Sequence, residues 1–404
     1  MNAVLWLSLT FTAAGLNADP SRVEKFLHTG DFQGGEKALL KELKTQPKDS
    51  QLRFELGALQ FIHAVEGLGQ GLYRHGLRPN GGFGNEIPFM RLPVPENPDP
   101  QEISYEQFRA LFSSFSKRIS EAEKNLSLVM DESVRLPLRM GLIKLDMTGN
   151  GNPETNFKAI VNRYIGGNQG LPGALGDMPV TFDRGDALWL QGYCNLLQAL
   201  TSFILAHDFQ ESFEVGATLV FPKVKTPHGF LNAIPRRRTN WFPDDIVDVI
   251  AFVHSWRFPL KHPDKMKESL AHLEKVIALS RETWKSILAE TDDDNEWLPN
   301  PKQKGVLGIP VGNAMIIGWI GFLDDAEKIL QGKLLLPYWR EGETRGVNLN
   351  KVFTEPRNFD VIYWIQGTAA TPYLEKGPTT SAPRWQMLQR LFRGEFIGFA
   401  FWFN

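Results

Sequence analysis

The chain has 404 residues, of which 42% are hydrophobic and 22% are charged, the composition of a globular protein with a large apolar core. Its 44 basic and 46 acidic residues give a formal net charge of -2, so no basic excess marks nucleic acid as a partner. Cys194 is the only cysteine, which excludes an internal disulfide. The length predicts two or three domains, or a helical array attached to a larger body.

Residues 1–18 have the features of an export signal. Ala3 to Gly15 is an uncharged apolar run with the length of a signal-peptide core, and small residues follow it around Ala18. The run is too short for a comfortable membrane span. No Lys or Arg precedes it, and the alternative is a buried first helix. We expect residues 1–18 to be removed as a signal peptide and the mature chain to be periplasmic or secreted.

Residues 19–77 carry a pattern of short helices. Residues 28 to 50 read "HTGDFQGGEKALLKELKTQPKDS" and resemble the second half of a tetratricopeptide repeat. Gly30-Asp31-Phe32 stands where that family has its turn between helices, Leu39 and Leu43 fall at packing positions, and Pro47 stands where the unit ends. Leu56-Gly57 matches the Leu-Gly pair of the next unit.

This resemblance covers about residues 20 to 77, or one and a half to two units. Gly35 and Gly69 depart from the Ala that the family favours, and Ala64 replaces the turn Gly. Because each unit needs a neighbour to cover its apolar face, the hairpins are expected to pack on the rest of the protein. The resemblance implies a docking surface for a protein partner, and the alternative is a purely structural helical hairpin.

Residues 78–103 form the clearest domain boundary, because six prolines and three glycines there exclude one regular element. Residues 104–404 are expected to form a helical body. Apolar residues recur at helical spacing after Ser104, which can cap the helix that follows. Further helices are predicted over 187–206 and 263–290. The 187–206 helix has no charged residue, but polar residues interrupt it, so we expect a core helix and no membrane span in the mature chain.

The stretch "LDMTGNGNPE", residues 145 to 154, is the strongest chemical signal in the body. It places oxygen-bearing residues at alternate positions, as in loops that bind calcium with six to eight oxygens. The candidate ligands are Asp146, Thr148, Asn150, Asn152 and Glu154. Gly151 would take the sharp turn that brings them inward, and a helix would follow from Phe157.

This pattern resembles the first nine positions of an EF-hand loop, which implies calcium as a ligand. Phe157 stands where the family has its bidentate Glu, and Pro153 where it has an aliphatic residue. A ligand from outside the loop would then be needed, and Asp183 and Asp186 are the candidates. The alternatives are a Gly-Asn turn without an ion and capping of the next helix by the two aspartates.

Two features of the C-terminal third complete the prediction. "AETDDDNEWLPNP", residues 289 to 301, is a dense acidic loop beside Trp297, which suggests a cation, a basic partner or a glycan cleft. The final residues, "FRGEFIGFAFWFN", are apolar and should be buried.

The sequence therefore predicts a mainly α protein, with tetratricopeptide-like hairpins packed on a larger helical body. Beyond the two partial motifs it resembles exported bacterial proteins in general, which implies no activity. The leading hypothesis is an exported binding or scaffolding protein, stabilised by calcium. The alternative is an envelope or secreted hydrolase that acts on glycans through paired carboxylates.

Overall fold

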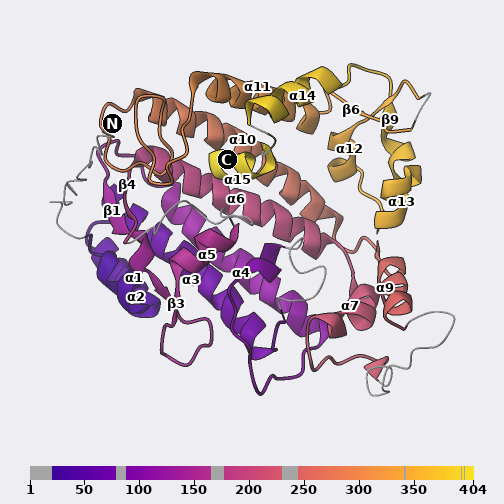
Figure 1. Cartoon of the computed structure of the whole chain (residues 1–404), viewed down its shortest axis with the longest axis horizontal. Helices are drawn as coiled ribbons and strands as arrows, with labels where there is room; N and C mark the ends of the chain where they lie inside the picture. Colours follow the sequence, from indigo (N-terminus) through magenta and orange to yellow (C-terminus); the bar gives the residue numbers. More distant parts are fainter. Residues whose placement is uncertain are drawn as a thin grey trace, which may run out of the picture.

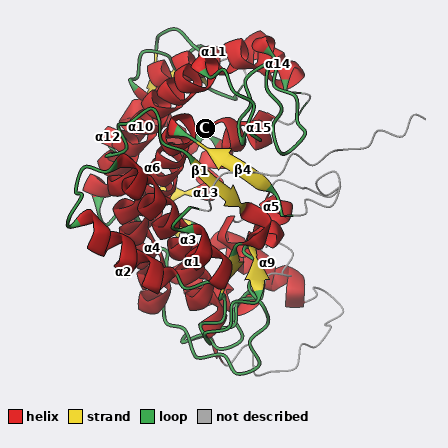
Figure 2. Cartoon of the chain, turned by 90° about the vertical axis from the view of Figure 1, so that its left-hand side faces the viewer, coloured by secondary structure: helices red, strands yellow, loops and turns green. Residues whose placement is uncertain are grey.

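A computed structural model describes residues 21–78, 88–164, 177–229, 244–340, 343–392, 394 and 396–404 (Figure 1). The predicted signal peptide at 1–18 lies outside the described residues. Helices make up most of the described chain and the strands are short (Figure 2), so the predicted mainly α class is confirmed. Within the described residues, no helix is both long enough and apolar enough to cross a membrane.

The centre of the molecule is a row of long helices. They are α3 (Ser50–Arg74), α4 (Tyr105–Leu126), α6 (Arg184–Ala206) and α10 (Pro263–Ala289). Helix α3 packs against α4, α4 against α6, and α6 against α10, which Figure 1 shows as neighbouring diagonal helices. Apolar side chains at helical spacing, such as Phe115 and Ile119 on α4 and Ile277 and Trp284 on α10, are buried between these helices.

Local capping explains where two of these helices begin. The Ser104 hydroxyl accepts a hydrogen bond from the Gln107 amide at 3.2 Å, and the Gln107 side chain accepts one from the Ser104 amide at 2.8 Å. Asp183 and Asp186 form the same reciprocal arrangement at the start of α6. Both arrangements satisfy amides that a helix leaves free at its first turn. The predicted caps of both helices are confirmed.

The N-terminal segment forms one short hairpin followed by a long helix. Helix α1 (Glu24–Thr29) ends at Gly30, which has a φ of 72°, and Asp31 caps α2 (Phe32–Leu43). Leu39 and Leu43 are buried, as predicted. Helix α3 then continues without a break through Ala64, where the repeat would turn. Ala has the highest helix propensity, so nothing at this position stops the helix, and a second hairpin does not form.

Short antiparallel ladders connect the helices. Strand β1 (Leu136–Arg139) pairs with β4 (Pro179–Phe182), with Leu136 opposite Phe182. Strand β2 (Lys144–Leu145) pairs with β3 (Thr155–Asn156), so that Leu145 lies opposite Thr155 and the candidate loop closes between them. The remaining ladders are β5 (Arg257–Phe258) with β8 (Phe359–Asp360), and β7 (Gly346–Val347) between β6 (Leu336–Pro337) and β9 (Leu374–Glu375).

Shorter helices cover the row and complete the body. The α-helices are α5 (Phe157–Tyr164), α7 (Gln210–Gly216), α9 (Asp244–His254), α11 (Asn313–Leu330), α12 (Leu349–Thr354), α13 (Val361–Gln366), α14 (Ala382–Leu391) and α15 (Phe396–Phe403). Single 3-10 turns are η1 (Pro88–Arg91), η2 (Met140–Leu142), η3 (Ala217–Leu219) and η4 (Thr368–Tyr373).

The C-terminal helix α15 is buried, as its apolar sequence predicts. Phe403 is 0% exposed, and its ring centroid lies 4.8 Å from that of Trp284 on α10. The indole of Trp189 on α6 donates to the carbonyl of Trp402 at 2.9 Å. Helix α15 therefore joins the core of the row.

Candidate functional site

The candidate loop turns between β2 and β3 through two left-handed glycines. Gly149 has a φ of 74° and Gly151 a φ of 83°, a region that residues with a side chain rarely adopt. The predicted sharp turn at Gly151 is therefore confirmed, and α5 begins at Phe157 as predicted. Asp146 at the base of the loop is 8% exposed, whereas the tip from Gly149 to Asn152 lies in solvent.

The Asp146 carboxylate is the centre around which the loop folds. Its Oδ1 accepts hydrogen bonds from the Thr148 amide at 3.1 Å, the Thr148 hydroxyl at 2.9 Å and the Gly149 amide at 2.7 Å. Its Oδ2 accepts one from the Gly151 amide at 2.7 Å. Burial acts to raise the pKa of Asp146, but these hydrogen bonds outweigh it and leave that pKa below its usual range.

The other predicted ligands in the loop are further into solvent. The Asn150 side chain accepts a hydrogen bond from the Asn152 amide at 2.7 Å. Glu154 is exposed. The structure thus brings Asp146 and Thr148 into contact, and leaves Asn150, Asn152 and Glu154 on the outside of the same loop.

Helix α3 holds the base of the loop with Glu66, a residue that no sequence motif singles out. Glu66 accepts a hydrogen bond from the Asp146 amide at 2.6 Å, and Gln70 donates one to the Asp146 carbonyl at 2.8 Å. Burial, opposed in part by that first hydrogen bond, raises the pKa of Glu66 to about 7. A Cβ at Gly69 would lie 2.2 Å from the Met147 sulfur, so the Met147 side chain packs closely on α3 where the loop meets the helix.

Asp183 and Asp186 belong to a different group of side chains. Asp183 Oδ1 accepts hydrogen bonds from the Gly185 amide at 2.7 Å and the Asp186 amide at 3.4 Å, and Asp186 Oδ2 accepts one from the Asp183 amide at 3.1 Å. The acidic groups that act on the pKa of Asp186 are Asp183, Glu290 and Glu296. These oxygens therefore cap α6, and we leave both aspartates out of the candidate calcium site.

Asp183, Asp186 and Glu296 are buried and Glu290 is half-buried, and we call these four residues the carboxyl cluster because each acts on the pKa of at least one other. Asp186 is 5% and Glu296 4% exposed. Burial, with repulsion from Asp183, raises the pKa of Asp186 well above its usual range. Burial and the Asp183 charge raise the pKa of Glu290 to about 8, and burial raises that of Glu296 to about 7. The acidic character of the 289–301 loop is visible in the sequence, but its contact with α6 through Trp297 and Trp189 is not.

Aromatic residues next to Asp183 and Glu296 in the chain pack against one another and against α6. The Trp297 ring centroid lies 5.7 Å from that of Trp189 and 6.4 Å from that of Phe182. The Asp183 charge is one of the causes that raise the pKa of Glu290, and a glycosidase places its two carboxyl groups about 5–9.5 Å apart. The hydrolase hypothesis stays a prediction.

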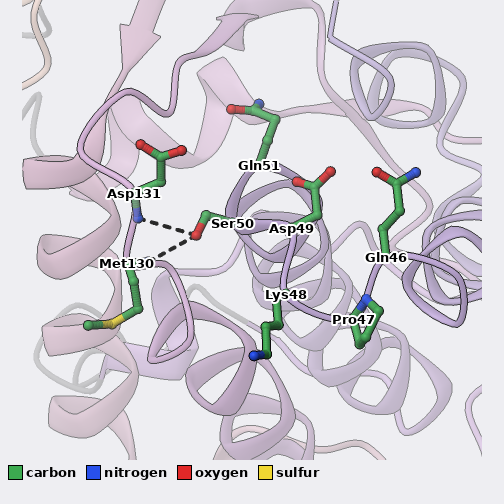
Figure 3. Close-up of a pocket in the computed structure, with 8 residues that line it drawn as sticks. All are labelled: Gln46, Pro47, Lys48, Asp49, Ser50, Gln51, Met130 and Asp131. Atoms are coloured by element: carbon green, nitrogen blue, oxygen red, sulfur yellow. Dashed lines mark hydrogen bonds between the residues drawn. The ribbon is translucent and has the colours of Figure 1, made fainter.

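An open hollow of 810 Å³ lies where α2 is joined to α3. It is lined by Gln46, Pro47, Lys48, Asp49, Ser50, Gln51, Met130 and Asp131 (Figure 3). The Ser50 hydroxyl accepts hydrogen bonds from the amides of Met130 at 3.1 Å and Asp131 at 3.2 Å, and so fixes the segment after α4 to the start of α3. Met130 is 71% exposed beside this hollow.

Within the described residues, no three His, Cys, Asp or Glu side chains are grouped so that they could hold a metal ion. A site at the Asp146 loop would therefore depend on amide, hydroxyl and carbonyl oxygens in addition to carboxylates. No protein-family model matches the chain, and searches of curated proteins and of solved structures return no match. The resemblances to tetratricopeptide repeats and to an EF-hand loop stay predictions.

Proposed function

We propose that this chain is an exported binding or scaffolding protein in which calcium supports the Asp146 loop. The observation that carries the proposal is a pair of buried carboxylates at the base of the loop: Asp146, 8% exposed, and Glu66, 5% exposed. Calcium prefers carboxylate, carbonyl and hydroxyl oxygens. Asp146, Thr148 and main-chain carbonyls of the loop would supply these, with Asn150, Asn152 and Glu154 at its outer side.

Glu66 fills the role of the external donor that the truncated motif requires. It comes from α3, and its hydrogen bond to the Asp146 amide places its carboxylate against the first residue of the loop. A cation there would also remove the repulsion that Asp146 exerts on Glu66. Such a site would join the loop to α3, and through α3 to the N-terminal helices that border the hollow.

The hydrogen bonds within the loop set the expected affinity. A carboxylate has about four lone-pair sites that can accept hydrogen bonds. In the Asp146 carboxylate, hydrogen bonds from Thr148, Gly149 and Gly151 already occupy these sites. Calcium must replace or share some of these bonds. We expect a dissociation constant of about 10⁻⁴–10⁻³ M, as in extracellular calcium modules.

Thermal unfolding with calcium and with a chelator tests this proposal. At about a tenfold excess over the dissociation constant, calcium should stabilise the native protein by about 1.4 kcal/mol. Asp146→Asn should abolish this increment, because it removes the charge at nearly constant size. Glu66→Gln should reduce the increment.

Asp131→Asn is the matched control. Asp131 also accepts hydrogen bonds within its own turn, from the Ser133 amide at 2.9 Å and the Ser133 hydroxyl at 2.7 Å, but it is exposed. The control should respond to calcium like the parent. A parent whose melting ignores both chelator and millimolar calcium would reduce the loop to a self-capped turn.

A further inference from the structure

The tip of the Asp146 loop is an asparagine followed by a glycine, Asn150-Gly151. Both residues are exposed, as is Asn152 after them. An asparagine side chain can close a five-membered succinimide ring with the backbone nitrogen of the next residue, and a glycine there offers no side chain to block the approach. A Cβ at Gly151 would meet nothing within 4 Å, so the loop leaves space for such a ring.

Two hydrogen bonds act on the groups that would form this ring. The Gly151 amide donates to Asp146 Oδ2 at 2.7 Å, and the Asn152 amide donates to Asn150 Oδ1 at 2.7 Å. The first places a carboxylate on the hydrogen that the attacking nitrogen must lose, within the reach of about 2.6–3.2 Å that a general base needs. The second places a donor on the oxygen that becomes negative as the side-chain carbonyl is attacked.

The directions of these hydrogen bonds are compatible with the attack. The N–H bond of Gly151 lies in the plane of its peptide bond, whereas the nitrogen attacks through its electrons above or below that plane. Asp146 can therefore hold the hydrogen while the Asn150 side chain approaches from one face. The hydrogen bond from the Asn152 amide turns that side chain back toward the main chain of the next residue. Base, nucleophile, electrophile and oxyanion donor thus lie within residues 146–152.

We propose that Asn150 is a site of self-catalysed deamidation in the native protein, with the Asp146 carboxylate as the general base. The Gly151 nitrogen forms a bond to Asn150 Cγ, and its proton passes to Asp146. The bond from Cγ to the side-chain nitrogen then breaks, and this nitrogen takes the proton from Asp146 and leaves as ammonia. Water adds to either carbonyl of the succinimide and opens it to aspartate or isoaspartate. Water is the only co-reactant, and it reaches the exposed tip freely.

The aspartate product changes the charge of the loop. It places a carboxylate at position 150, where the unmodified loop has a neutral amide. Calcium sites are tuned by the number of charged ligands, so the modified loop should bind calcium more tightly than the unmodified one. This consequence rests on the proposed function, whereas the deamidation itself does not.

The rate of deamidation in the native chain, compared with that in denaturant, tests the proposal. Mass spectrometry of the peptide that contains Asn150 measures it, with chelator present so that no cation occupies Asp146. The native rate should exceed the denatured rate by about tenfold or more, because only the folded loop holds the general base. Asn80-Gly81, the other Asn-Gly pair of the sequence, is the internal reference, and both pairs should react at similar rates in denaturant. A native rate at Asn150 no higher than its denatured rate would overturn the proposal.

Substitutions separate the carboxylate from the rest of the loop. Asp146→Asn removes the base and should lower the native rate to that of the denatured chain. Asn150→Gln should stay intact, because its longer side chain would have to close a larger ring. Asp99→Asn is the charge-matched control: the Asp99 side chain is 95% exposed and pairs with Lys223 at 3.1 Å, so this variant should react like the parent. An unchanged rate in a folded Asp146→Asn protein would overturn the role of the carboxylate, and the comparison of native and denatured parent decides if that variant does not fold.

The calcium consequence has a separate readout. Asn150→Asp reproduces the aspartate product and should show a larger calcium-dependent rise in melting temperature than the parent. An equal rise in both would overturn the consequence. If neither protein responds to calcium, the calcium proposal fails, while the deamidation, which is measured with chelator present, is decided by its own rates.

Trapping of the intermediate gives an independent check on the chemistry. Hydroxylamine attacks a succinimide and breaks the chain at that point. Brief treatment of aged native protein should therefore cut between Asn150 and Gly151, and the Asn150→Gln variant should resist cleavage there. A parent that deamidates without any such cleavage would exclude the succinimide route.

Discussion

Asp146 and Asp183 perform the same local task at two places in the chain. Each accepts backbone hydrogen bonds from residues that closely follow it, and each thereby fixes a turn or a helix start. Their surroundings differ, because Glu66 lies behind Asp146 and Glu290 lies against Asp183. The same residue type therefore belongs to a candidate cation loop in one place and to the cap of a buried helix in the other.

At the residue scale, Gly151→Ala should destabilise the protein by about 1–2 kcal/mol, because its left-handed backbone is strained for Ala. A Cβ at Gly151 would meet nothing within 4 Å, so the change measures the backbone alone. Gly398→Ala is the matched control. It also meets nothing within 4 Å, but it lies in α15 and should stabilise by about 0.5–1 kcal/mol. Chemical denaturation checks both values, and equal effects would contradict the assignment of strain.

At the element scale, α3 and α15 show how packing completes what local preference begins. Helix α3 is continuous over the segment where two repeat helices were expected, and it supplies both Glu66 and Gln70 to the loop. Helix α15 has almost no polar face. Its position is stabilised by packing of Phe403 against Trp284 on α10 and by the hydrogen bond between Trp402 and Trp189 on α6. The position of each helix in the fold is therefore determined by its contacts with other helices and with the loop.

Removal of one ring from α15 tests how much the C-terminal helix contributes. Phe403→Ala should lower the free energy of unfolding by about 3–5 kcal/mol, because it leaves a cavity beside Trp284. Ile365→Ala on α13 is the surface control. Its side chain is 71% exposed, and its loss should cost about 0.5 kcal/mol or less. Similar denaturant midpoints for the parent and Phe403→Ala would mean that α15 is peripheral to the fold.

At the scale of the whole molecule, the hollow at the α2–α3 junction is the place where the proposed docking role can be tested. The hollow combines exposed Met130 with Lys48 and Asp131, and Figure 3 shows Met130 and Lys48 pointing to one side of it. Methionine is enriched at protein interfaces, so exposed Met130 is the position at which to look for a protein partner.

A photocrosslinking residue in place of Met130 should therefore form one discrete adduct in cells that produce the protein naturally. The same residue at Ile317 is the control, because Ile317 is 72% exposed and Met130 is 71% exposed, but Ile317 lies on α11. Mass spectrometry of the adducts identifies the partner. Equal adduct patterns at both positions would argue against a docking site at this hollow.

Much of the helical architecture and part of the loop were predictable from the sequence, since they depend on residues close together in the chain. Ser104 caps α4 through Gln107, three residues away, and Asp183 caps α6 through Asp186. The turn at Gly151 follows from its lack of a side chain. In each case one short segment contains both partners of the interaction.

Only the tertiary structure decided which acidic groups meet. Glu66 and the Asp146 amide are 80 positions apart, and Glu290 reaches Asp183 from the far end of another helix. Apolar periodicity shows which face of a helix is buried, but it does not show which other helix covers that face. Since the raised pKa values of Glu66 and Glu290 come mainly from that burial, the protonation state of both groups depends on the packing of α3, α6 and α10.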